Sequence, residues 1–209
     1  MSFEGWSVFA SFWVLFVTTP GPNAINCIQN GMNHGFARSL WGVAGILTQA
    51  ALFLGLSAAG ITALIAASPM GFQIAKYIGA TFLIFLGLRG LWLAKRPLKA
   101  RETTAHSIYG RAFMIATINA KSVAGYLAAF SQFVQTDVPL AGQMWVIVPT
   151  ALIITSLSYT GYTALGARLG RLAMGAVMNV WLRRVMGLCF IIYGVLLGMA
   201  SGPEGDFNG

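Results

Sequence analysis

The chain has 209 residues, of which 57% are hydrophobic and only 9% are charged. A soluble domain carries about 25% charged residues, so this composition excludes a protein whose whole surface faces water. We expect a single membrane domain covering residues 1–209. The net charge of +8 does not indicate nucleic-acid binding, because the basic residues lie between long apolar runs with no soluble module to present a binding face.

Apolar runs of about 20 residues predict membrane-spanning helices, and we expect six of them. The first run lacks the basic start and cleavage site of a signal peptide, so we interpret it as a retained span. Prolines split it into halves covering about residues 5–19 and 22–32, and the others are expected at about 39–67, 71–93, 112–134, 142–166 and 185–200. Residues 169–184, basic at both ends, predict either an amphipathic helix along the inner interface or a tight re-entrant turn.

Lys and Arg concentrate in alternate loops. The segment KRPLKARETTAHSIYGR, residues 95–111, carries five of them, Arg38 precedes the second span, and a segment with four arginines precedes the sixth. The intervening loops and both ends of the chain lack Lys and Arg. By the positive-inside rule, the three basic loops are cytoplasmic and both termini are periplasmic or extracellular.

The first span is interrupted by Pro20, Gly21 and Pro22, directly before Asn23. Unpaired backbone groups in hydrocarbon cost several kcal/mol each, so such a break at membrane depth needs protein or water to satisfy the freed groups. Three further uncharged amides follow within the same segment and are suited to line the site, namely Asn26, Gln29 and Asn30. The break therefore predicts a polar site inside the membrane.

The fourth span has a comparable interruption, ATINAKSVAGY, which places Asn119 and Lys121 in an otherwise apolar segment. The interruptions fall in the first and fourth spans, so the repeat length is three spans, and a repeat of odd length inverts the second half relative to the first. We predict repeat one at about 5–94, a cytoplasmic loop at 95–111 and repeat two at 112–201. The expected fold is an all-α membrane protein of six helices in two inverted three-helix repeats, with the first and fourth helices interrupted and a transport site near the midplane.

Four motifs occur in one order along the chain: Pro-Gly-Pro-Asn at 20–23, then Gly35, Arg38, Gly42 and Gly45, then YIGATFLIFLGLRGL at 77–91, and Asn119-Ala120-Lys121 followed by FSQFV at 130–134. Together they resemble the LysE/RhtB family of amino-acid exporters, over about residues 9–198. The resemblance implies export of amino acids or related metabolites through a bacterial inner membrane, six spans and, in many members, a homodimer. Ala120 stands where proline is usual, and Asn23 where many members carry an acidic residue.

The five acidic residues all fall outside the predicted spans: Glu4, Glu102, Asp137, Glu204 and Asp206. A site for lysine or arginine would be expected to include a buried carboxylate, so a neutral or zwitterionic amino acid, or a related small metabolite, fits better. Its carboxylate would meet Lys121 and the helix N-terminus near Asn23. Its ammonium would meet the amide oxygens of Asn23, Asn119 or Gln49, exposed carbonyls, or the ring of Tyr126.

Lys121 is also the candidate proton carrier, because it is the titratable group expected at depth. Either it cycles a proton during export, or the substrate gradient alone drives transport. Structural roles compete with these: Lys121 could extend its ammonium to an interface, and Asn23 could cap the helix after the break. We expect no cofactor and no metal site.

Three other functional classes fit the sequence less well. A membrane thiol–disulfide electron carrier needs two approaching cysteines, whereas Cys27 lies in the first span and Cys189 in the sixth. A cation exporter of similar architecture would want carboxylate, His or Cys ligands at depth. No catalytic motif is present, so we do not expect an enzyme.

Overall fold

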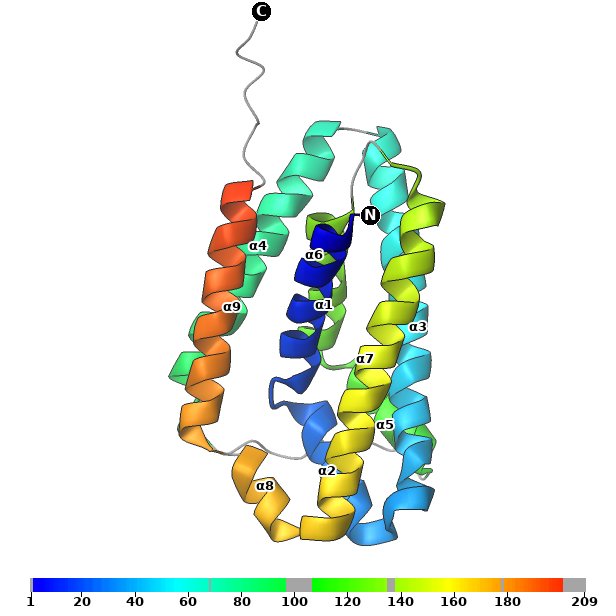
Figure 1. Ribbon diagram of the computed structural model, residues 1–209, viewed down its shortest axis with the longest axis vertical. Coiled ribbons are helices and arrows are strands. Elements are labelled where there is room, and N and C mark those ends of the chain that lie inside the picture. The colour runs from blue at the N-terminus through cyan, green and yellow to red at the C-terminus, as the bar shows by residue number, and fades with distance from the viewer. Residues whose placement is uncertain (1, 68, 97–106, 135–137, 178, 201–209) are drawn as a thin grey trace, which may run out of the picture.

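The computed structural model describes residues 2–67, 69–96, 107–134, 138–177 and 179–200. All regular structure in these ranges is α-helical (Figure 1). In chain order the helices are α1 (Phe3–Thr18), α2 (Pro22–His34), α3 (Phe36–Ala67), α4 (Pro69–Trp92), α5 (Ile108–Thr117), α6 (Ala120–Phe133), α7 (Leu140–Leu169), α8 (Arg171–Val177) and α9 (Val180–Ala200). The predicted all-α class is confirmed. Most of the predicted cytoplasmic loop and four of the five acidic residues, Glu102, Asp137, Glu204 and Asp206, lie outside the described residues.

Two helices are long and apolar enough to cross a membrane alone, Phe36–Gly60 within α3 and the whole of α7. Two bent pairs pass the same test when each is taken as one span: α1 with α2, bent by 59°, and α8 with α9, bent by 42°. Length and composition of the described residues thus support two to four spans. The remaining helices do not pass the test by themselves: the apolar part of α4, Tyr77–Trp92, is shorter than 18 residues, α5 has 10 residues and α6 has 14.

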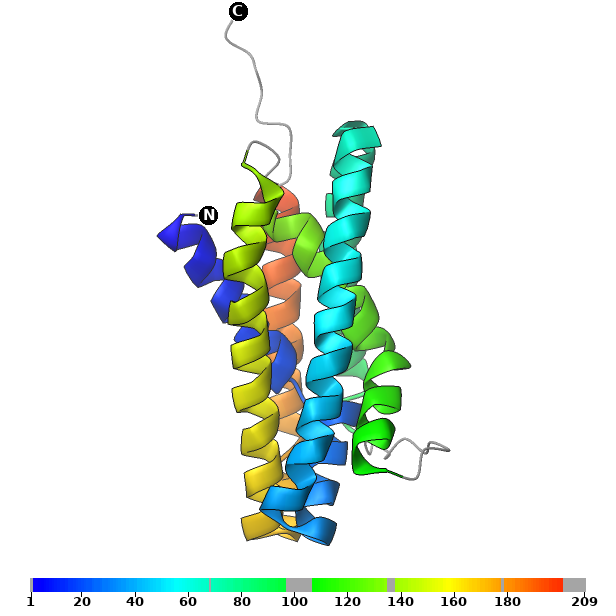
Figure 2. The same cartoon turned by 90° about the vertical axis from the view of Figure 1, so that its right-hand side faces the viewer.

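Both predicted helix breaks lie at about mid-height of the bundle (Figure 1). The helices α1 and α2 follow one another from the top of the view to the bottom, and α6 and α5 form a second divided pair behind them. The start of α1, the end of α3, the start of α4 and the end of α9 lie toward the upper end, whereas the α2–α3 and α7–α8 junctions share the lower end. The same arrangement is seen from the side in Figure 2. The helix ends that carry Arg38, Arg168 and Arg171 are therefore opposite to the start of α1 and the end of α9.

Two glycines end helices where the chain reverses at the lower end. Gly35 closes α2 with a φ of 72°, and Gly170 closes α7 with a φ of 51°. Residues other than glycine rarely adopt this left-handed backbone conformation, so glycine is favoured at both helix ends. After Gly170 the chain forms the short helix α8, and α9 begins at Val180, five residues before the predicted start at 185.

Close backbone contacts fix α2 against α7 and α4 against α9. A Cβ added to Gly31 would lie 2.8 Å from the backbone nitrogen of Ala167, and one added to Gly166 would lie 2.8 Å from Ile28 Cα. At the other pair, a Cβ on Gly194 would lie 2.8 Å from the carbonyl oxygen of Ala80. Such small-residue crossings let membrane helices associate through van der Waals packing alone.

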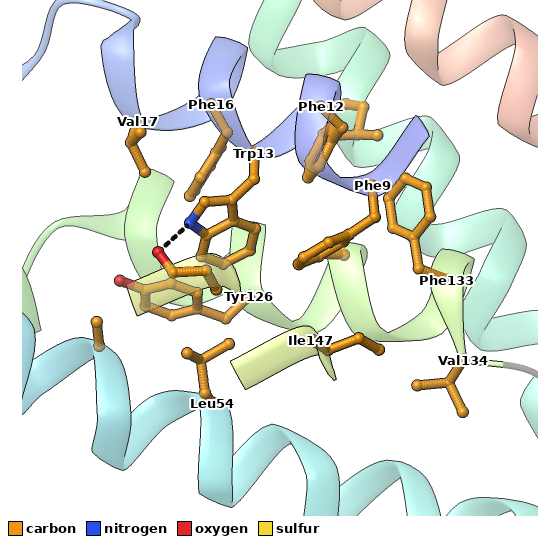
Figure 3. Close-up of a cluster of buried hydrophobic side chains, with 14 of the residues drawn as sticks. Phe9, Phe12, Trp13, Phe16, Val17, Leu54, Tyr126, Phe133, Val134 and Ile147 are labelled. Carbon is orange, nitrogen blue, oxygen red and sulfur yellow. Dashed lines mark hydrogen bonds between the residues drawn. The ribbon is translucent and has the colours of Figure 1, made fainter. Parts of the chain in front are cut away.

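A buried aromatic cluster holds α1 between α6 and α7 (Figure 3). The contribution of α1 is four rings, Phe9, Phe12, Trp13 and Phe16. The ring centroids of Trp13 and Tyr126 are 5.6 Å apart, and those of Phe9 and Phe133 are 5.4 Å apart. Trp13 Nε1 also donates hydrogen bonds to the carbonyl of Ala151 and to Thr155 Oγ1, each at 3.0 Å. These contacts position the C-terminal end of α1 at the centre of the bundle.

Candidate substrate site

The first break separates α1 from α2 at residues 19–21. Prolines lack a backbone N–H, so Pro20 and Pro22 cannot continue the hydrogen-bond ladder of α1. Pro22 instead occupies the first position of α2, where its missing N–H costs nothing. The break therefore frees the last carbonyls of α1 and the first N–H groups of α2, with their partial negative and positive charges, at the same depth.

The freed carbonyls of α1 are satisfied mainly by side chains from other helices. Lys121 Nζ donates to the carbonyl oxygens of Phe16 and Thr19, at 2.7 and 3.0 Å. The Tyr162 hydroxyl of α7 donates to the carbonyl of Thr18 at 2.6 Å. Only the Leu15 carbonyl is satisfied locally, by the backbone N–H and the hydroxyl of Thr19. Lys121, which follows the second break, thus caps the C-terminal end of α1, which precedes the first break.

The Lys121 ammonium also lies against two aromatic rings. Its Nζ is 5.1 Å from the ring centroid of Phe16 and 6.0 Å from that of Phe190 in α9, distances suited to cation–π attraction. Glu4 is the one acidic residue among the described ranges, and it is exposed near the start of α1. Carbonyl dipoles and rings therefore hold this cation, with no carboxylate in the described part of the chain beside it.

The second break is closed by its own chain. The N–H groups of Ile118 and Asn119 donate to the carbonyls of Met114 and Ala116, at 3.0 and 3.3 Å. Asn119 Oδ1 accepts from the backbone N–H of Lys121 at 3.2 Å, as an N-cap does at the start of a helix. The side-chain oxygen predicted as a substrate ligand therefore caps α6 in this structure.

Asn23 and Lys121 occupy matching positions, since each is the second residue of the half-helix after its break. The structure brings the two half-helices together: Asn23 Nδ2 donates to Ser122 Oγ at 3.5 Å, a long hydrogen bond. The side chain of Tyr159 in α7 also interacts with that of Asn23. Asn23 is 3% exposed, and its Oδ1 has no hydrogen-bond partner within the geometric limits among the described residues. An acceptor is thus buried at the N-terminus of α2.

Further buried amide groups extend this polar region. Within the described part of the chain, Asn26 Nδ2, Asn30 Nδ2 and Gln49 Nε2 have no hydrogen-bond partner. Burying an unpaired polar group costs about 1–3 kcal/mol, so a polar occupant would be favoured here. Asn23, Asn26 and Asn30 share one face of α2 by their spacing, whereas Gln29 is half-buried on another.

Tyr126 and Gln49 interact with each other. The Tyr126 hydroxyl donates to Gln49 Oε1 at 3.3 Å, and Gln49 is fully buried. The Tyr126 ring is stacked on Trp13 with an interplanar angle of 25°, and the ring of Phe53 lies 6.2 Å away. The ring predicted as a platform for a substrate ammonium is therefore packed in the aromatic cluster, and its hydroxyl orients Gln49.

Sequence reasoning missed the contribution of α7. Thr155, Tyr159 and Thr163 recur every four residues and are all buried, which places a polar stripe on one face of an otherwise apolar helix. The string SYTGYT contains two of these residues and Tyr162, and its polar spacing was a usable signal.

Arg183 was assigned to a basic loop, but it lies inside α9 and is 9% exposed. Its guanidinium Nη1 donates to the carbonyls of Ala94 and Arg96 at 2.8 and 2.6 Å, and Nη2 donates to that of Leu93 at 2.7 Å. These carbonyls follow the end of α4. The helix α9 can begin before the apolar run because this arginine finds three acceptors there.

Residues 14–201 match the LysE type translocator family. The chain belongs to this family. It is 32% identical to an "uncharacterized membrane protein" of Vibrio cholerae serotype O1, over 96% of this chain and 100% of that protein. It is also 28% identical to a homoserine/homoserine lactone efflux protein of Salmonella typhimurium, over 96% of this chain and 98% of the relative.

A leucine efflux protein of Salmonella choleraesuis is 30% identical, over 73% of this chain and 74% of the relative. No solved structure matches the chain significantly. Membership of a translocator family favours transport over the redox-carrier and enzyme alternatives. Cys27 is buried in α2 and Cys189 is partly buried in α9, and both are free thiols.

Proposed function

We propose that this translocator exports neutral or zwitterionic amino acids, or closely related small metabolites, across the bacterial inner membrane. The family and the relatives named for homoserine and leucine efflux support export of this class. The observation that carries the proposal is a buried site at the first helix break with unpaired amide groups and one cation, in a region where the described residues place no carboxylate.

The two ends of the broken helix have the polarity that a zwitterion needs. The N-terminus of α2, beside Asn23, suits the substrate carboxylate, with Lys121 as its candidate counter-ion. The unpaired Oδ1 of Asn23 and the carbonyls of α1 suit the ammonium, and Gln49, Asn119 and Tyr126 complete the proposed set. Lys121 remains the candidate proton carrier, with export driven by the substrate gradient alone as the alternative.

The proposed architecture has six spans, with repeats at about 5–94 and 112–201 on either side of a cytoplasmic loop. The mid-height breaks and the matching positions of Asn23 and Lys121 support this inverted repeat. The gathering of Arg38, Arg168 and Arg171 at the end opposite the start of α1 and the end of α9 supports periplasmic termini. A homodimer in the lipid bilayer completes the proposal.

Counterflow in proteoliposomes tests the function. The purified protein is reconstituted and loaded with leucine, homoserine, alanine, arginine or glutamate in turn, with and without a pH gradient, and protein-free liposomes serve as the control. We expect the neutral amino acids to exchange fastest. A preference for arginine over every neutral amino acid would contradict the proposal. A rate that follows the imposed pH gradient would identify proton coupling.

A further inference from the structure

The carbonyls of Phe16 and Thr19 converge on one point, and that point holds a primary ammonium group. The α-ammonium of an amino acid is chemically the same kind of group. We infer that these carbonyls are the ammonium site of the substrate, and that Lys121 occupies the site as a tethered surrogate in the empty carrier. On loading, the two ammonium groups exchange, and the freed Lys121 pairs with the substrate carboxylate. This inference rests on the proposed function.

The means of capping distinguishes this helix end from others in the chain. The ends of α2 and α7 are closed locally, by the backbone N–H groups of Gly35 and Gly170, and within the described ranges no side chain from another helix bonds to them. The end of α1 is instead closed by Lys121, a residue more than 100 positions away in sequence. Lysine is a compact charge on a flexible four-carbon stem, so it can leave an acceptor pair and reach a new partner without any backbone change.

The surroundings of the ammonium suit a small substrate as well as a lysine. The rings of Phe16 and Phe190 accept any primary ammonium on their faces. The hydrogen bond from Asn23 to Ser122 places the first turn of α2 against the first turn of α6, next to Lys121. This contact brings the N-terminus of α2, whose backbone N–H groups suit a carboxylate, close to Lys121.

Charge balance explains why the exchange favours a zwitterion. With Lys121 protonated, the site without substrate carries one positive charge, and a zwitterion adds none, so the loaded site keeps a net charge of one. An amine without a carboxylate would bring a second cation into a low-dielectric region beside Lys121, which is strongly unfavourable. The same repulsion disfavours arginine. After release, Lys121 returns to the carbonyls, so the empty carrier reorients with the end of α1 satisfied.

The inference predicts a reversal of selectivity in Lys121→Met. Binding of leucine, alanine and homoserine, and of the carboxamide of each, is measured by calorimetry on protein in nanodiscs. We expect wild type to bind the best amino acid about tenfold or more tighter than its carboxamide, equivalent to about 1.4 kcal/mol. In Lys121→Met the amino acid loses the partner of its carboxylate and the carboxamide loses its competitor. The order should therefore reverse, with the carboxamide bound tighter than in wild type.

Arg183→Met is the matched control, because it also removes a cation from helix-end carbonyls but lies away from the proposed site, and it should keep the wild-type order. Lys121→Gln, which retains a neutral donor, gives the same test should Lys121→Met not fold. The wild-type arm needs no substitution: equal affinity for an amino acid and its carboxamide overturns the inference. A folded Lys121→Met or Lys121→Gln that keeps the wild-type order also overturns it.

The two proposals fail in different ways. If wild type neither binds nor exchanges any amino acid of the panel, the proposed function fails, and the inference fails with it. If wild type exchanges neutral amino acids but the selectivity does not reverse, the proposed function stands and only the role of Lys121 as a surrogate is refuted.

Discussion

Two basic side chains in this protein close the C-terminal end of a helix to which they do not belong. Lys121 donates to two carbonyls at the end of α1, at the centre of the bundle, and Arg183 donates to three carbonyls after the end of α4. Both satisfy the partial negative charge of a helix C-terminus. They differ in what surrounds them, because only Lys121 adjoins a group of buried amides with unpaired atoms.

The chemistry of the two residues matches this difference. The planar guanidinium of arginine presents donors in a rigid fork, so Arg183 bonds three carbonyls in one fixed geometry. The lysine ammonium is a point charge that turns freely and can be replaced by another ammonium. In the proposed cycle, the same electrostatic interaction serves as a permanent closure at Arg183 and as an exchangeable one at Lys121.

Removing the exchangeable cation should have the largest effect. We expect Lys121→Met to lower counterflow of neutral amino acids by tenfold or more, about 1.4 kcal/mol or more in the transport barrier, because the carboxylate loses its partner. Initial rates in proteoliposomes measure this, normalised to the amount of folded protein. Lys121→Arg tests whether charge alone suffices, and we expect it to remain impaired because the larger fork does not exchange readily. Unchanged counterflow in Lys121→Met would place this residue outside the transport cycle.

Removing the permanent closure should instead reduce stability. Arg183→Met leaves three carbonyls without their donor, and we expect a loss of about 1–3 kcal/mol in the free energy of unfolding. Denaturant unfolding in detergent measures it, and Arg183→Lys should recover part of the loss. The substrate affinity of the folded fraction should stay at the wild-type value. If Arg183→Met lost substrate affinity without losing stability, the assignment of a purely structural role to Arg183 would be wrong.

The hydroxyl of Tyr162 provides an intermediate case, because it caps Thr18 at the same helix end without a charge. We expect Tyr162→Phe to cost about 1 kcal/mol of stability, the usual contribution of one such hydrogen bond. Export should fall only a few-fold, since the ammonium site keeps both of its carbonyls. Thermal unfolding and counterflow on the same preparation separate the two effects. A loss of export as large as that of Lys121→Met would mean that capping, rather than charge, is what transport requires.

The smallest effect is expected where the chain caps itself. Asn119→Ser preserves an N-cap oxygen for the backbone of Lys121, so stability should change by no more than a few tenths of a kcal/mol. If Asn119 acts only as a cap, affinity for the best amino acid should also be unchanged in calorimetry. A clear loss of affinity in this variant is expected if the Asn119 amide also contacts the substrate, as in the proposed site.

The sequence allowed prediction of those features that depend on local chemistry. Prolines cannot continue a helix, so the break after Thr18 followed from three residues, and the α-helical membrane class followed from composition. The partners of Lys121 could not be predicted, because its two acceptors are backbone carbonyls in a distant helix, and every sequence provides carbonyls at every position. The acceptors of Arg183 could not be predicted for the same reason, and so the start of α9 at Val180 was not predicted either. The packing of Tyr126 on Trp13 depends equally on tertiary contacts.

The helix α7 contacts both halves of the broken helix, α1 and α2. Its Ala151 and Thr155 accept hydrogen bonds from Trp13 in α1, and its Gly166 meets Ile28 of α2 backbone to backbone. We therefore expect α1, α2 and α7 to travel as one body, with the angle at Pro-Gly-Pro preserved throughout a transport cycle. Spin labels on α1 and α2 should keep a constant separation while labels spanning α2 and α5 change theirs, and a variable α1–α2 distance would refute this. The helices that move would then be those on the side of the molecule that contains α6. The contacts of the Lys121 ammonium would therefore differ between the inward-facing and outward-facing states.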